Sequence, residues 1–129
     1  MTLEEAKNFF QQDKFATCAA GIVLKELDEN GAVCTMTITD NHLNAVGSVM
    51  GGALFTLADF GFAAAANFKG MGTVTLSSQI QFLSGAKGNI LTAVTRPVKE
   101  GRHACFYETE ITDELGTKIA VVSASGYRR

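Results

Sequence analysis

The sequence predicts an α+β protein in which an antiparallel β-sheet wraps around one long central helix. Two short segments with the alternating pattern of β-strands precede a long apolar stretch, residues 50–68, and four more follow it. Short turns separate the last four segments, as in an antiparallel meander. The apolar stretch would be hydrophobic on nearly every side of a helix, so it must be buried on nearly every side. The expected order is α-β-β-α-β-β-β-β.

A short amphipathic helix is expected at the start of the chain, ending near Asp13. Thr2 and Glu5 have the spacing of a capping box, in which each side chain bonds the backbone N–H of the other. Apolar residues then recur at helical spacing: Leu3, Ala6, Phe9 and Phe10. The apolar side of this helix must cover another part of the molecule.

Two strands are expected before the long helix, at residues 18–27 and 33–39. Asn30 and Gly31 lie between them, and both residue types tolerate the positive φ that tight hairpin turns require. After the long helix, the alternation is clearest in the first of four further strands: residues 73–83, 90–99, 102–112 and 117–127. Pro97 has no backbone N–H to donate, so it predicts a sheet edge or a bulge.

Length, charge and cysteine content limit the classes of function. A chain of 129 residues suits a single domain, residues 1–129. The net charge of −2 and the lack of a basic patch argue against nucleic acid as a partner. The cysteines are far apart with no CxxC pair, which favours a reducing compartment and argues against a disulfide framework or a metal site: Cys18, Cys34 and Cys105.

Residues 50–68 are nearly long enough and apolar enough to cross a bilayer. However, Asp59 would then lie near the hydrocarbon centre, where a carboxylate costs several kcal/mol. The first residues are acidic and polar, unlike those of a signal peptide. We therefore expect a soluble, cytoplasmic protein with no membrane partner.

Asp59 is the one charge in the long helix, and its neighbours one turn away are mostly apolar: Phe55, Thr56, Phe62 and Ala63. A buried carboxylate without partners is very costly, so it finds donors or shifts its pKa. Asp59 therefore either bonds a backbone group at a crossing point or subunit contact, or has a functional role. A partner subunit would cover any part of the helix that the sheet leaves open.

Gly51 and Gly52 begin this helix and allow another molecule to approach closely. The first N–H groups of a helix have no intrahelical partner, and the helix dipole favours negative charge there. These groups could bind a carbonyl oxygen that becomes an oxyanion. Alternatively, the two glycines only form a tight turn. The preceding loop adds Asn44 and His42, which are either turn and cap residues or site residues.

The stretch HLNAVGSVMGGALFTLAD resembles the signature of hot-dog-fold acyl-CoA thioesterases of the phenylacetate-pathway and hydroxybenzoyl-CoA type. In that family a loop H-x-N-x-x-G leads into H-G-G, and a carboxylate follows in the central helix. The element order and the late pattern from Gly101 to Ala120 are similar as well. The resemblance implies hydrolysis of an acyl-CoA to a free acid and CoA, without a metal or redox cofactor.

The resemblance also implies roles for individual residues. Asp59 matches the catalytic carboxylate, which acts as a general base for water or as a nucleophile. Gly51 matches the residue whose backbone N–H polarises the thioester carbonyl, and Asn44 matches a polar side chain near the thioester or the attacking water. In the family, the carboxylate and the glycine come from different subunits. We therefore expect a homodimer at least, and further expect a homotetramer built as a dimer of dimers.

The substrate contacts expected from the resemblance are an apolar acyl pocket and a basic tunnel mouth for the CoA phosphates. Pocket residues and residues around it are Met50, Gly52, Phe55, Phe62 and the loop residue His42, and the basic candidates are Lys87 and Arg102. Met50 departs from the family, which often has His there, so any orienting or proton-handling role of that His is absent.

Three other functions stay open. The Met50 departure favours a non-catalytic module that binds acyl-CoA. A hydratase or dehydratase usually pairs a His with a carboxylate, and the helix region has no His after His42, which argues against that class. A purely structural dimer module would leave Asp59 without a cavity nearby.

Overall fold

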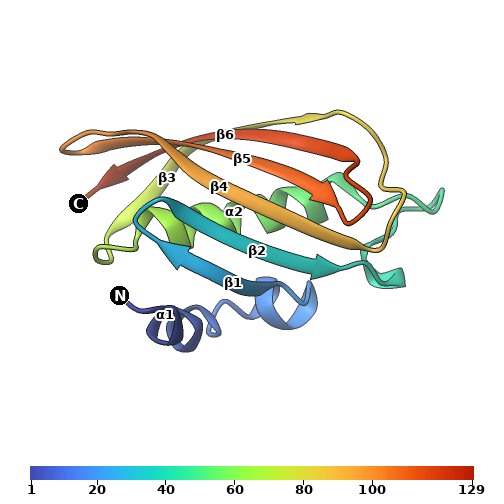
Figure 1. Cartoon of the computed structure of the whole chain (residues 1–129), viewed down its shortest axis with the longest axis horizontal. Coiled ribbons are helices and arrows are strands. Elements are labelled where there is room, and N and C mark those ends of the chain that lie inside the picture. Colours follow the sequence, from blue (N-terminus) through green and yellow to red (C-terminus); the bar gives the residue numbers. More distant parts are fainter.

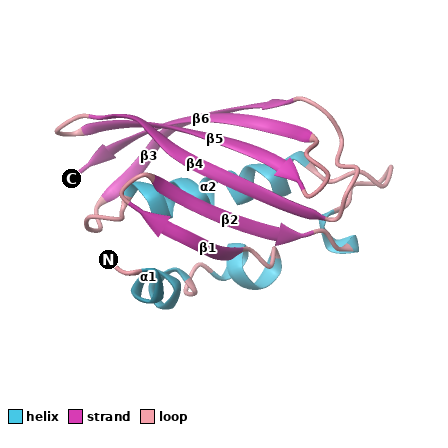
Figure 2. Cartoon of the chain, viewed as in Figure 1, coloured by secondary structure: helices cyan, strands magenta, loops and turns pink.

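The structure, a computed structural model, describes all residues 1–129 and shows one antiparallel sheet wrapped around a long helix (Figures 1 and 2). The elements are α1 (Leu3–Phe10), β1 (Val23–Asp28), β2 (Gly31–Thr37), α2 (Gly51–Ala66), β3 (Thr73–Phe82), β4 (Ile90–Glu100), β5 (Ala104–Asp113) and β6 (Lys118–Arg128). Short π-helical and 3₁₀ turns lie at Phe15–Ala19 and Asp40–His42. The predicted α+β class and order of helices and strands are confirmed.

The strand order in the sheet is β1-β2-β4-β5-β6-β3, so the predicted four-strand meander is wrong for β3. β3 pairs with β6 at the far edge, from Thr73 opposite Arg128 to Phe82 opposite Ala120. Residues 83–89 then cross back to β4. This crossing spans three strand spacings, about 14 Å, and seven extended residues reach about 23 Å. A short connection was therefore compatible with either arrangement.

The N-terminal segment is helical for longer than predicted. Thr2 and Glu5 form the predicted capping box, with N–H···O distances of 2.9 and 3.1 Å. The strand predicted at residues 18–27 begins only at Val23, because residues 15–19 form a π-helical turn. The Thr17 hydroxyl donates to backbone carbonyls of the preceding residues, and this local bonding competes with a strand.

Two turn predictions are confirmed. Gly31 has φ +131° in the β1–β2 hairpin, and a Cβ there would collide with the Thr95 carbonyl oxygen. Pro97 lies at a bulge, because the β4–β5 register shifts between Pro97 and Lys99. β2 pairs with β4 only as far as Thr95, so on the β2 side no strand is paired with Pro97.

The hydrophobic core lies between α2 and the inner face of the sheet. Leu57 of α2 is fully buried, as are Leu91 and Ile111 of the facing strands. Gly61 allows close approach, since a Cβ there would lie 2.6 Å from the Thr95 hydroxyl oxygen. Cys34 and Cys105 are buried in this core, whereas Cys18 is exposed. None of the helices combines the length and the hydropathy that a membrane span requires.

Candidate functional site

The first turn of α2 has two free backbone donors. Met50 precedes the helix in an extended conformation and gives no side-chain cap. Within α2, the first N–H groups that have an acceptor are those of Ala53 and Leu54, which donate to the Met50 carbonyl at 3.0 and 3.3 Å. The N–H groups of Gly51 and Gly52 have no acceptor in the chain. They lie at the positive end of the helix dipole, so they can bind an anionic or partly anionic oxygen.

The loop before α2 is held by Asn44. Its carboxamide oxygen accepts hydrogen bonds from the N–H groups of Val46 and Ser48 at 3.1 and 3.0 Å. Leu43 and Val49 form an isolated β-bridge that closes the same loop. The carboxamide NH₂ of Asn44 makes no hydrogen bond within the chain, so this is the group that can contact a ligand.

His42 is buried and bonded at both ring nitrogens. Its Nδ1 accepts a hydrogen bond from the Thr39 N–H at 2.9 Å, so Nε2 carries the proton and donates to the Ala20 carbonyl at 2.7 Å. Its own carbonyl accepts the Met50 N–H at 2.8 Å. The substrate contact predicted for His42 therefore has no free ring nitrogen to make it, and the residue instead ties the α2 loop to the N-terminal segment.

Asp59 lies on the face of α2 that its own chain leaves uncovered, whereas most of the other helix residues are buried or partly buried, as expected. Gly52, Phe55 and Asp59 are the exposed residues of the helix, and their spacing places them on one face. The Asp59 carboxylate makes no hydrogen bond or ion pair within the chain. Desolvation, and secondarily the negative charge of Asp13, raise the pKa of Asp59 above its usual value. The carboxylate is thus available and more basic than usual.

Gly51 and Asp59 are too far apart in one chain to act on the same carbonyl group. Eight residues separate them, and a rise of 1.5 Å per residue places them about 12 Å apart along the helix axis. A thioester carbonyl in contact with the Gly51 N–H needs its base or nucleophile within about 3.5 Å. One chain therefore does not bring these two predicted site residues together at a single carbonyl group.

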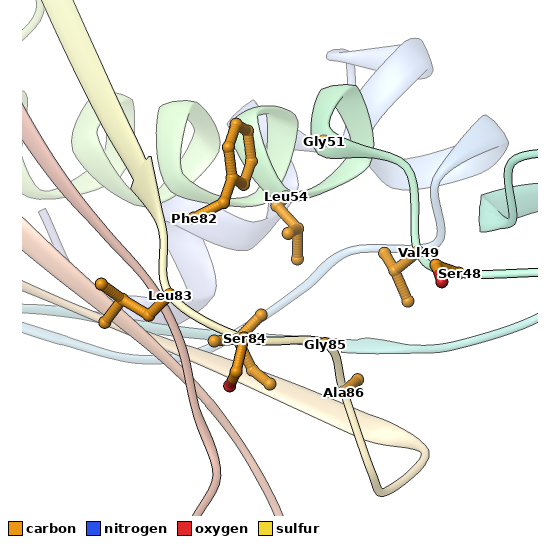
Figure 3. A pocket seen from close by; sticks show the side chains of 10 residues that line it. Ser48, Val49, Gly51, Leu54, Phe82, Leu83, Ser84, Gly85 and Ala86 are labelled. Carbon is orange, nitrogen blue, oxygen red and sulfur yellow. The ribbon is translucent and has the colours of Figure 1, made fainter.

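Two pockets flank the first turn of α2. One of about 350 Å³ lies between the helix and the β3–β4 crossing (Figure 3), and its walls include Gly51, Leu54, Phe82 and Leu83. The Phe82 ring packs over Gly51, where a Cβ would lie 2.8 Å from its Cζ atom. The other, of about 570 Å³, is mainly apolar and is lined by Phe15, Ala19, Ala20, Asn41, His42, Met50, Gly52, Ala53 and Thr56. Either pocket can receive part of a ligand whose oxygen contacts the free N–H groups.

Comparison with known proteins identifies the family. A model described as thioesterase superfamily matches residues 46–120, which include the end of the loop, α2 and strands β3, β4 and β5. Over 126 residues the chain is 35% identical to the acyl-coenzyme A thioesterase PaaI of Escherichia coli, covering 97% of this chain and 89% of that protein. The chain belongs to the thioesterase superfamily. Human acyl-coenzyme A thioesterase 13 is 24% identical over 90% of this chain and 85% of its own length.

Solved structures of similar proteins confirm the hot-dog fold of this thioesterase-superfamily chain. The E. coli PaaI structure matches with a TM-score of 0.90 at 30% identity, covering 98% of this chain and 93% of that one. A hypothetical thioesterase from Streptococcus pneumoniae, solved with coenzyme A, matches with a TM-score of 0.84 at 25% identity, covering 93% and 96%. The similarity therefore extends over nearly the whole chain.

Three further predicted site residues of this thioesterase-superfamily chain lie apart from one another. Phe62 is 3% exposed and packs edge to face on Tyr107 in the core, so it does not line either pocket. Lys87 is exposed on the β3–β4 crossing, directly after the pocket residue Ala86. Arg102 is exposed in the β4–β5 turn, at the end of the molecule where α2 finishes (Figure 1), so one chain does not bring it near Gly51.

The sequence pattern gave no signal for two aromatic residues that line the pockets flanking the first turn of α2. Phe82 lies in the expected strand at residues 73–83 and lines the pocket beside Gly51, and Phe15, in a segment without a motif, lines the other pocket. Asp113 lies in the TDELG stretch between the last two expected strands, and its carboxylate bonds to the distant β3–β4 crossing. The turn chemistry of that stretch was visible in the sequence, whereas its partner 25 residues away was not.

Proposed function

We propose that the protein hydrolyses acyl-CoA thioesters to a free acid and CoA, at a site built by two copies of the chain. One observation carries this proposal: the same helix has two unsatisfied N–H groups, at Gly51 and Gly52, and an unpaired, more basic carboxylate, Asp59, on its uncovered face. In a two-fold dimer with antiparallel α2 helices, Asp59 of each chain faces Gly51 of the other. A homotetramer would form when two such dimers pair.

The oxyanion site is the first turn of α2. The Gly51 N–H donates to the thioester carbonyl oxygen and stabilises the negative charge that develops there, and the helix dipole adds to this effect. The NH₂ group of Asn44 lies in the loop just ahead and can hold the thioester or the attacking water. No metal or redox cofactor is needed for these steps.

Asp59 of the other chain supplies the second function. As a general base, it takes a proton from water while the water oxygen bonds to the carbonyl carbon. The tetrahedral intermediate then collapses, the C–S bond breaks, and the CoA thiolate takes up the proton. As a nucleophile, Asp59 would instead attack the carbonyl carbon and expel the CoA thiolate as the C–S bond breaks, and water would then hydrolyse the resulting acyl anhydride. The raised pKa makes the ionised Asp59 carboxylate a stronger base than that of an ordinary aspartate.

The relatives support acyl-CoA as the substrate class. A relative named acyl-coenzyme A thioesterase shares more than a third of its aligned residues with this chain, and another similar structure contains coenzyme A. Met50 and Phe55 are exposed apolar side chains at the first two turns of α2 and would contact the acyl group. Lys87, exposed beside the pocket, would contact the phosphates of CoA.

The second candidate function is binding of acyl-CoA without hydrolysis, and Met50 is the observation that favours it. Its thioether lies 4.0 Å from the position of a Cβ on Gly52, beside the free N–H groups, where it offers no proton. Binding of acyl-CoA with no release of thiol, over a panel of aryl and alkyl thioesters, would establish this function in place of the first.

Replacement of Asp59 by Asn tests the proposed chemistry. Because Asn cannot take a proton from water, we expect kcat to fall at least about 100-fold in a thiol-release assay on acyl-CoAs. Asp28→Asn, at the β1–β2 hairpin, removes the same charge away from the site and should keep wild-type turnover. An Asp59→Asn enzyme with the wild-type kcat would rule out the mechanism.

A mixed-dimer experiment tests whether the site is shared. Gly51→Pro removes the oxyanion N–H at the first helical position, where the backbone suits Pro and the exposed Phe82 ring must move to admit the new Cβ. In a dimer of this variant with Asp59→Asn, one of the two sites has both groups intact. Random mixing yields half mixed dimers with half their sites active, so about a quarter of wild-type activity should return. Two inactive variants that stay inactive after subunit exchange would contradict the shared site.

A further inference from the structure

The β3–β4 crossing, residues 83–89, forms one wall of the pocket beside Gly51. Its first residues line the pocket: Leu83, Ser84, Gly85 and Ala86 (Figure 3). Leu83 and Ser84 are held to β6, since their N–H groups donate to the Ile119 carbonyl at 2.8 and 3.3 Å. Gly85 and Ala86 make no backbone hydrogen bond. The shape of this wall therefore depends on what holds the crossing at its other end.

Asp113 holds that other end. One carboxylate oxygen, Oδ2, accepts hydrogen bonds from the N–H groups of Lys87 and Gly88, both at 2.9 Å. The other oxygen, Oδ1, accepts from the N–H groups of Leu115 and Thr117 at 3.0 and 2.9 Å. The residue is 4% exposed. One buried carboxylate thus joins the crossing to the β5–β6 turn with four bonds.

This bonding keeps the carboxylate charged. Burial by itself would raise the pKa of Asp113, but the N–H groups of Gly88, Lys87 and Thr117 together hold it well below its usual value. Charge-assisted hydrogen bonds of this kind are stronger than neutral ones. The link between Asp113 and the crossing is therefore present throughout the pH range in which the protein would work.

Glu114 holds the crossing from the outer side. Its carboxylate accepts hydrogen bonds from the N–H groups of Asn89 and Ile90, all at 2.9 Å. It packs so closely on Gly88 that a Cβ at that position would collide with it. Gly88 therefore lies between the buried carboxylate of Asp113 and the exposed carboxylate of Glu114.

We infer that Asp113 is a positioning residue of the thioesterase, which holds the pocket wall in front of Gly51 and thereby sets the KM for acyl-CoA. The inference rests on the proposed function. Asp113 touches no reacting atom in this account. It acts through the Lys87 and Gly88 backbone, so it places both the wall at residues 83–86 and the basic side chain that would contact the CoA phosphates.

The first test is Asp113→Asn. An amide offers one acceptor oxygen and one NH₂ group, so one of the two N–H pairs would face a donor and lose its bonds. We expect the KM for acyl-CoA to rise about tenfold while kcat stays within about twofold, because the wall moves and the reacting groups do not. The dissociation constant of CoA alone should rise similarly. Amide hydrogen exchange of residues 83–88 should become faster.

Two further variants keep the inference testable if Asp113→Asn folds poorly. Gly88→Ala displaces the Glu114 carboxylate and the crossing without changing Asp113, and it should also raise the KM and speed exchange at residues 83–88. Glu110→Gln makes the same chemical change as Asp113→Asn on the outer face of β5 and should leave all three measurements unchanged.

The outcomes separate this inference from the proposed function. Faster exchange in the crossing with unchanged KM and unchanged CoA affinity would overturn the positioning role. So would unchanged exchange in both Asp113→Asn and Gly88→Ala. A wild-type protein that binds CoA but hydrolyses no thioester would overturn the proposed hydrolysis instead, and CoA affinity and exchange in the variants would still decide the role of Asp113.

Discussion

Asp59 shows how the surroundings of one side chain set its chemistry. It is the one charged residue of α2, and it bonds nothing in its own chain. Desolvation raises its pKa first, and the Asp13 carboxylate adds to the shift. A base must be deprotonated to act, so activity is lost as the pH falls through this raised pKa. The acid limb of the pH profile should therefore lie above the range of an ordinary aspartate.

Asp13→Asn tests this account of the pKa. Removing the Asp13 charge removes one cause of the raised pKa, so the acid limb of kcat/KM should shift to lower pH, with little change in the plateau rate. The measurement is a pH profile of thiol release for both enzymes. Asp28→Asn serves as the control, and an acid limb that moves equally in the control, or not at all in Asp13→Asn, would contradict the assignment.

At the scale of elements, the β1–β2 hairpin depends on one glycine. Gly31 combines a positive φ with close packing against the Thr95 carbonyl of β4. The β1–β2 turn and strand β4 are thus in contact. The turn therefore reverses the chain and also packs directly on β4.

Gly31→Ala should therefore lower the free energy of unfolding by at least about 2 kcal/mol, since both the backbone conformation and the collision are unfavourable. Gly21→Ala is a matched control, because Gly21 has φ +72° but open space around its Cβ position. It should cost only about 1 kcal/mol. Urea denaturation of both variants checks the difference, and equal losses would show that the contact with Thr95 has no effect.

At the scale of the molecule, one face of α2 stays exposed to solvent in a single chain. The sheet covers the opposite side of the helix, and exposed apolar side chains lie on the helix and on the free edge strand β3: Met50, Phe55, Leu76 and Phe82. Exposed apolar side chains on the uncovered side of the helix and along an unpaired strand edge favour cover by a second copy.

Phe55→Asp should dissociate the proposed dimer, because it places a second charge beside Asp59 on this face. We expect a smaller species in sedimentation at micromolar protein and loss of thiol release, with an unchanged circular dichroism spectrum. Val98→Asp, which places the same charge on an exposed position of β4, should change neither mass nor activity. A Phe55→Asp variant that keeps the wild-type mass would argue against this face as the interface.

The chain's local patterns determined most of the architecture. The capping box at Thr2, the hairpin at Gly31, the bulge at Pro97 and the central helix with Asp59 were predicted because each depends on residues close together in sequence. The same holds for Gly51, whose free N–H follows from its place at a helix start. Such features need only hydrogen-bonding rules and periodicity.

Tertiary structure alone decided the partners of long-range contacts. β3 lies beside β6 because residues 83–89 are long enough to cross the sheet, and no periodicity records which edge a strand joins. Phe62 packs on Tyr107 in the core, and the ring of His42 hydrogen-bonds to Thr39 and Ala20. Asp113 hydrogen-bonds to the backbone of the pocket wall. The physical reason is that periodicity specifies which face of an element is apolar, while packing of distant segments decides which polar group finds which partner.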